Sequence, residues 1–175
     1  MIAAFELIDT GMKVGLGAFI SWFTTYWFTG VKFRQSRQQQ RMDHHRELMQ
    51  DVARQAEQVH HVFMKYFELI HEYITATKAR YDWPQSRRAE LYLVVDEMVA
   101  SFNDLTSAES KLLLLNEKKL YKCLRKFRTR VVFFRRHFYI DKKDLSEQEA
   151  ADIKREISKL REEFFDALSE KYAMV

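Results

Sequence analysis

The sequence predicts an all-α protein in which one N-terminal transmembrane helix continues into an antiparallel four-helix bundle. The chain has only four glycines and one proline in 175 residues, which favours long helices joined by few turns. Apolar residues recur at helical spacing in four segments. An uncharged stretch, Val14 to Val31, precedes them. We therefore divide the chain into residues 1–33, an N-terminal tail with a single transmembrane helix, and residues 34–175, a cytoplasmic helical bundle.

The uncharged stretch is about 18 residues long, close to the minimum for a helix that crosses a bilayer. A cleavable signal peptide fits less well, because the start of the chain carries Glu6 and Asp9 in place of a basic region. A helix lying on the membrane surface would need basic residues on one face, and the stretch has none. A buried core helix remains an alternative, because Ser21 and several threonines lower the hydrophobicity.

The flanking charges predict the orientation of this helix. Before it, Lys13 is offset by Glu6 and Asp9. After it, the flank is basic and contains Lys32, Arg34, Arg37 and Arg41. The positive-inside rule then predicts a single-pass protein of the inner (plasma) membrane, with the N-terminus outside and the C-terminal domain in the cytoplasm. The same four residues are expected to contact anionic lipid at the membrane surface.

One face of the predicted transmembrane helix carries small and hydroxylated residues. Small side chains let helices approach closely in lipid, and hydroxyl groups form hydrogen bonds across the contact. The face consists of Gly11, Gly15, Ala18, Trp22, Thr25 and Thr29. We expect it to mediate homo-oligomerisation. The alternative is that glycine and threonine are simply common in membrane helices. Association around a polar pore is a further hypothesis, secondary to association itself.

The first soluble helix should continue the transmembrane helix through the polar stretch Gln35 to Arg46 and end near Trp83–Pro84, where proline disfavours helical geometry. Its apolar residues form a heptad-like seam typical of coiled coils. The seam consists of Val52, Ala56, Val59, Phe63, Tyr66, Ile70, Tyr73 and Thr77.

The second helix is expected from about Ser86 to Leu115. Its apolar stripe consists of Leu91, Val95, Met98, Phe102 and Leu105. The capping-box pattern from Thr106 to Glu109 allows a kink or a restart there. Because Leu112 to Leu115 is apolar on all sides, we expect this turn to be buried on several sides.

The third and fourth helices complete the predicted bundle. The stripe of the third is Leu120, Leu124, Phe127, Val131, Phe134 and Phe138. The fourth begins at a capping box formed by Ser146 and Glu149, with Leu145 and Ala150 as its hydrophobic staple. Its stripe is Ile153, Ile157, Leu160, Phe164 and Leu168. Four such helices with short connections favour an antiparallel bundle.

The third helix is strongly basic, since Glu117 is the only acid between Asn116 and Tyr139. Like charges on one helix repel, so a compensating partner is required. The acidic fourth helix could supply it internally, through Glu147, Glu149, Asp152, Glu156, Glu162, Glu163, Asp166 and Glu170. An anionic ligand or the membrane surface could do so instead. The candidate ligand-binding residues are Lys118, Lys122, Arg125, Arg128, Arg130, Arg135 and Arg136.

Lysine and arginine clusters bind phosphates through charge-assisted hydrogen bonds, so a small nucleotide or a short oligonucleotide fits this patch. Duplex DNA is not expected, because no groove-reading motif is present and a membrane tether restricts access.

The sequence predicts no catalytic residue, cofactor or metal site. No metal-binding or phosphate-loop motif is present, and Cys123 is the only cysteine. Arg130 and His137, with six residues between them, resemble the Arg-to-His motif of HEPN-type ribonucleases, although Val131 stands where that motif has a polar residue. A ribonuclease is therefore a third hypothesis.

An N-terminal span, a helical cytoplasmic domain and the basic Asn116 to Tyr139 helix together resemble small membrane effectors of prokaryotic antiviral defence, including the nucleotide-gated accessory proteins of type III CRISPR systems. The resemblance implies an oligomeric effector whose cytoplasmic domain senses an anionic, nucleotide-like ligand or a partner, and whose transmembrane helices perturb the bilayer. The alternative is a non-enzymatic scaffold or adaptor that recruits a protein partner to the membrane.

Overall fold

The computed structural model describes the backbone of residues 2–142 and 144–173, and the side chains of residues 39–40, 42–142 and 144–172. Over these residues the chain is all-α. The helices are α1 (Ile2–Lys78), α2 (Gln85–Leu114), α3 (Lys118–His137) and α4 (Glu147–Ala173). The prediction of an all-α chain with four helices in a bundle is confirmed, and the prediction of a transmembrane helix stays a prediction.

The chain forms two compact units, Met1–His44 and His45–Val175. The predicted transmembrane stretch and its association face (Gly11, Gly15, Ala18, Trp22, Thr25 and Thr29) have side chains outside the described residues, as do Lys32, Arg34, Arg37 and Arg41. Among the helical residues that the structure does describe, none forms a segment long and apolar enough to cross a membrane.

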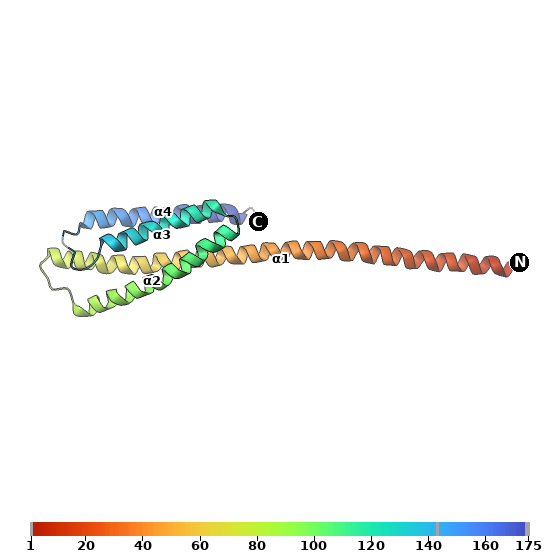
Figure 1. Cartoon of the computed structure of the whole chain (residues 1–175), viewed down its shortest axis with the longest axis horizontal. Coiled ribbons are helices and arrows are strands. Elements are labelled where there is room, and N and C mark those ends of the chain that lie inside the picture. Colours follow the sequence, from red (N-terminus) through yellow and green to blue (C-terminus); the bar gives the residue numbers. More distant parts are fainter. Residues whose placement is uncertain (1, 143, 174–175) are drawn as a thin grey trace. The chain divides into compact units, whose positions relative to one another are not determined.

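Within the unit that begins at His45, successive helices run in alternating directions around one core (Figure 1). The seam of α1 faces this core, and its predicted residues from Val52 to Ile70 are all buried. Tyr73 is only half-buried and Thr77 is exposed. α1 ends at Lys78, earlier than predicted, because Arg80 adopts a left-handed backbone conformation with φ of 53°.

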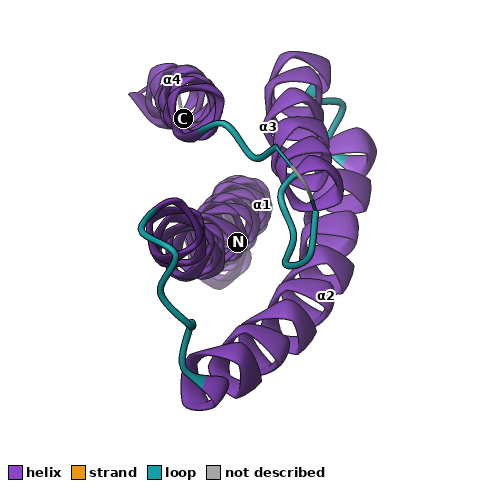
Figure 2. Ribbon diagram, turned by 90° about the vertical axis from the view of Figure 1, so that its left-hand side faces the viewer, coloured by secondary structure: helices purple, strands orange, loops and turns teal. Residues whose placement is uncertain are grey.

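α2 lies beside α3 at its C-terminal end and diverges from α3 and α4 toward its N-terminal end (Figures 1 and 2). Its backbone is helical through Thr106 to Glu109, so the capping-box pattern produces no break. The expected burial of Leu112 to Leu115 is wrong for two residues, because Leu113 is 51% exposed and Leu114 is 87% exposed. α2 is covered on one side only, so the other side of its last turn faces outward.

The stripes of α3 and α4 match the prediction closely. All six predicted residues from Leu120 to Phe138 are buried. In α4 the predicted residues are buried except Leu160, which is half-buried. The predicted cap at the start of α4 is present, because the backbone N–H of Glu149 donates to Ser146 Oγ at 3.2 Å.

Candidate anion-binding site

The basic residues of α3 divide into two groups, and the first is neutralised within the bundle. Arg130 Nη2 lies 2.5 Å from Glu156 Oε2, and Lys119 Nζ lies 2.6 Å from Glu170 Oε2. Both acids lie on α4, as the internal-pairing hypothesis requires. The acidic fourth helix therefore compensates part of the charge of α3.

A third pair has a partner that the charge pattern did not indicate. Arg128 Nε lies 2.8 Å from Glu109 Oε1, and Glu109 projects from α2 with only 9% of its side chain exposed. This carboxylate belongs to the Thr106 to Glu109 segment, where the sequence allowed a kink or a restart. Because Arg128 is paired with Glu109 of α2, it is not available to bind a ligand on the face that α3 shares with α4.

The second group has no carboxylate partner among the described residues. It consists of Lys118, Lys122, Arg125, Lys126, Arg135 and Arg136. The acids of α4 thus leave a substantial positive charge on α3. An anion is the ligand that this charge favours.

Three of these free cations border a groove between α3 and α4. The groove has a volume of about 610 Å³, within the range of small-molecule sites. Its basic residues are Lys122, Arg125, Lys126 and the paired Arg130, and its only acid is Glu156. The remaining lining residues are Tyr121, Thr129, Phe133 and Leu160.

Aromatic rings hold two of the groove arginines in place. Arg125 donates from Nη1 to Tyr121 Oη at 3.0 Å, and its guanidinium lies 6.0 Å from the centre of the same ring. The guanidinium of Arg130 lies 4.6 Å from the centre of the Phe133 ring. Such cation–π contacts restrict the conformations that the two arginine side chains can adopt. The groove therefore offers oriented cations next to apolar ring surface.

The structure brings together only part of the candidate set predicted from sequence. Lys122, Arg125 and Arg130 line the groove, whereas Arg128 is bound to Glu109. Lys118, Arg135 and Arg136 are not among the lining residues. Lys126 was part of the basic run but not of the candidate set. Tyr121, Phe133 and Leu160 were missed as lining residues. The spacing of Tyr121 and Phe133 to the cations of α3 could have indicated them, whereas Leu160 comes from α4, and no signal in the sequence indicated it.

The two residues of the HEPN-like motif both contact Phe133. His137 stacks on the Phe133 ring with 3.8 Å between ring centroids, and its Nδ1 lies 2.8 Å from the Phe133 carbonyl oxygen. Arg130 is paired with Glu156. In the described part of the chain, no group of three or more His, Cys, Asp or Glu residues could hold a metal ion.

A larger cavity, of about 860 Å³, lies between α1 and the start of α4. Its central carboxylate, Glu147, is 2.7 Å from Lys78 Nζ and 3.1 Å from His71 Nε2. The hydrogen bond from Lys78, with a smaller contribution from His71, lowers the pKa of Glu147 below its usual value. Glu68 and Glu147 offset two of the three lysine and arginine side chains in this lining, so its excess of positive charge is smaller than that of the α3–α4 groove.

Comparison with protein-family models matched no family, and searches of curated proteins and of solved structures found no match.

Proposed function

We propose that this protein is a membrane-anchored helical bundle whose α3–α4 groove binds a compact anionic ligand of the nucleotide class. The observation that carries the proposal is the groove itself. There Lys122, Arg125 and Lys126 have no carboxylate partner among the residues whose side chains are described, and they lie beside two aromatic rings. Phosphate groups would bind the cations through charge-assisted hydrogen bonds. A base would pack against ring and guanidinium surfaces.

The distribution of charge favours a ligand over complete internal neutralisation. α4 supplies one acid to the groove, Glu156, and it is paired with Arg130. The other three cations therefore keep their capacity to bind phosphate. The groove volume of about 610 Å³ accommodates a mononucleotide or a short oligonucleotide end.

The anchor completes the proposal. The uncharged residues from Val14 to Val31 would span the bilayer, and their glycine- and threonine-bearing face would join copies of the chain. In this scheme the protein is an oligomeric effector, and its helical bundle is the domain that senses the ligand. Ligand binding would change how the anchors assemble, and the assembled anchors would perturb the bilayer.

Nucleotide titration of the full-length protein in lipid nanodiscs tests the groove. The probes are ATP, a short oligoadenylate and inorganic phosphate. Arg125→Glu should weaken nucleotide binding by at least about tenfold, because it replaces an attractive contact with a repulsive one. Lys159→Glu is the matched control, since it makes the same charge change at an exposed α4 position outside the groove.

The outcomes of this titration are distinct. Equal losses in Arg125→Glu and Lys159→Glu would mean that only net charge matters. Binding of phosphate as tight as that of ATP would exclude a contribution from the aromatic rings. No binding of any probe by a folded wild-type protein would refute the nucleotide ligand.

Dye release from vesicles tests the effector mechanism. The full-length protein, reconstituted in dye-loaded vesicles, should release dye when the tightest-binding nucleotide is added. Arg125→Glu should abolish release by preventing binding, and Gly15→Leu should abolish it by blocking close helix approach. Release that persists in Gly15→Leu would contradict the role of this face.

A scaffold is the second candidate function, because α2 exposes large apolar residues. Tyr92, Leu93 and Val99 are 58%, 66% and 46% exposed. Exposed apolar surface of this kind is typical of protein-interaction sites. A scaffold predicts no dye release with any nucleotide, so the vesicle experiment separates the two functions.

A further inference from the structure

The turn between α2 and α3 exposes two leucines at its tip. Leu113 and Leu114 are the last residues of α2, and Leu114 is the most exposed large hydrophobic residue described, at 87%. The chain then reverses through Asn116, whose φ is 58°. The two leucines therefore lie directly before a tight reversal of the chain, with their side chains exposed to solvent.

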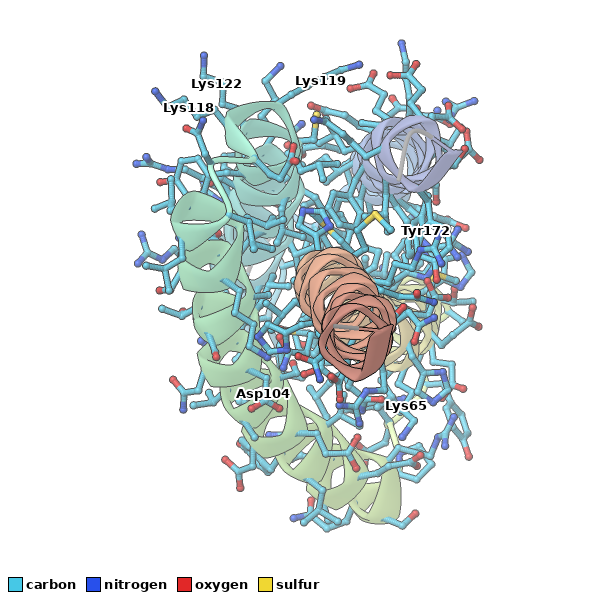
Figure 3. The ribbon with its side chains drawn as sticks, turned by 90° about the vertical axis from the view of Figure 1, so that its right-hand side faces the viewer. Lys65, Asp104, Lys118, Lys119, Lys122 and Tyr172 are labelled. Atoms are coloured by element: carbon cyan, nitrogen blue, oxygen red, sulfur yellow. The ribbon has the colours of Figure 1, made fainter. Side chains whose placement is uncertain are left out.

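Three lysines, Lys118, Lys119 and Lys122, follow these leucines within nine residues of the chain. Lys118 and Lys122 are exposed and have no carboxylate partner among the described residues, whereas Lys119 is paired with Glu170. Figure 3 shows all three lysines together at one end of the bundle, where α3 begins. The nearby acid, Glu117, is almost buried and lies 3.1 Å from Lys171 Nζ, so it does not offset them.

The bundle unit begins at this same end. His45, its first residue, has its Nε2 atom 3.8 Å from Glu117 Oε1 in the α2–α3 turn. In the sequence, only about 14 residues separate His45 from Val31, the last residue of the predicted anchor. A connection of this length limits how far the tip can lie from the membrane.

We propose that this tip, residues 113–122, docks on an anionic bilayer surface. The inference rests on the membrane anchor of the proposed function. The leucines enter the boundary between lipid headgroups and acyl chains, and the lysines bind lipid phosphates, as in other peripheral membrane contacts. Apolar side chains flanked by lysines suit this environment, because the charged ends remain at the headgroups.

A fluorescent depth probe tests the docking. Leu113→Cys in a Cys123→Ser background is labelled with an environment-sensitive dye, and the full-length protein is reconstituted in vesicles. We expect quenching by nitroxide headgroup lipids in vesicles of phosphatidylcholine mixed with phosphatidylglycerol. Quenching should fall at least about threefold in phosphatidylcholine alone and at high salt, because the lysine contacts are screened. The same probe at Tyr81→Cys, in the α1–α2 connection, should remain unquenched.

Matched variants separate the tip from general surface properties. Lys118→Glu and Leu114→Ser should reduce the quenching at least about threefold. Lys159→Glu and Leu93→Ser, which change an exposed lysine and an exposed leucine elsewhere, should leave it unchanged. Lys118→Glu should also leave nucleotide binding within about twofold, because Lys118 does not line the groove.

Each remaining outcome contradicts a defined statement. If the protein does not float with vesicles of either composition, the anchor and the docking are both wrong. If it floats but the probe at position 113 stays in water, only the docking is wrong. Equal quenching at positions 113 and 81, or in both lipid mixtures, also refutes a specific anionic docking surface.

Discussion

Tyr66 joins α1 to the segment that follows α3. Its hydroxyl donates to the Phe138 carbonyl oxygen at 2.7 Å, in a buried position. Burial raises the pKa of Tyr66 to about 12, above the ordinary value of 10.0. The folded chain therefore keeps a proton that the unfolded chain loses in this interval. The corresponding stabilisation is complete below pH 10 and is lost as the pH rises toward 12.

Tyr66→Phe should lower the free energy of unfolding by about 1 kcal/mol at neutral pH, because the Phe138 carbonyl loses its donor. It should also flatten the decline in stability between pH 10 and 12. Urea unfolding of both proteins across that range measures both effects. A decline of the same steepness in the variant would mean that other groups cause it.

Glu109 and Arg128 form an ion pair that joins α2 to α3, with 2.8 Å between Glu109 Oε1 and Arg128 Nε. Arg128→Met would leave the Glu109 carboxylate, which is only 9% exposed, without its cation. The free energy of unfolding should fall by about 1–3 kcal/mol. This is less than for a fully buried pair, because the Arg128 side of the pair is 30% exposed to solvent. Adding Glu109→Leu should restore much of this loss. A double-mutant cycle by urea unfolding provides the test, and additive losses would contradict the coupling.

At the level of helices, Ser146 determines where α4 begins. Its Oγ accepts from the Glu149 backbone N–H, which would otherwise be unsatisfied. Ser146→Ala should lower the free energy of unfolding by about 1 kcal/mol, and Ser146→Asp should retain most of it. Ser169→Ala, at an exposed position within α4, is the control and should change stability by less than about 0.5 kcal/mol. Equal effects at both serines would exclude capping as the cause.

The sequence allowed the buried faces of α3 and α4 to be predicted almost completely, and that of α2 only in part. Helical periodicity identifies which side of a helix is apolar, but not whether a neighbour covers it. Leu112 is buried while Leu113 and Leu114 are exposed, because α2 is packed on one side only.

The candidate site was predictable to a similar degree. The basic run of α3 located it, but the run could not show that Arg128 pairs with Glu109 while Lys126 borders the groove. Those assignments depend on how α2 and α4 flank α3. Charge patterning along one helix does not contain that information.

At the level of the whole molecule, the described core lies within one unit. The buried hydrophobic residues extend from Met49 to Leu168 and come from all four helices. We expect a fragment of residues 39–175 to unfold in one cooperative thermal transition with a fixed near-ultraviolet circular dichroism signal. A fragment ending at residue 145 would lose Ile157 and Phe164 and should lack that signal. Cooperative unfolding of the shorter fragment would show that α4 is dispensable for the core.

The hydrogen bond between Tyr66 and Phe138 can form only late in the synthesis of the chain. Its two residues are 72 positions apart. At about 5–20 residues per second, Tyr66 leaves the ribosome roughly 4–14 s before Phe138 can reach it. Throughout this interval the apolar seam of α1 lacks its later partners. A second nascent copy bound to this seam would compete with α3 and α4. We therefore expect the rate of translation to affect how much chain reaches the closed bundle.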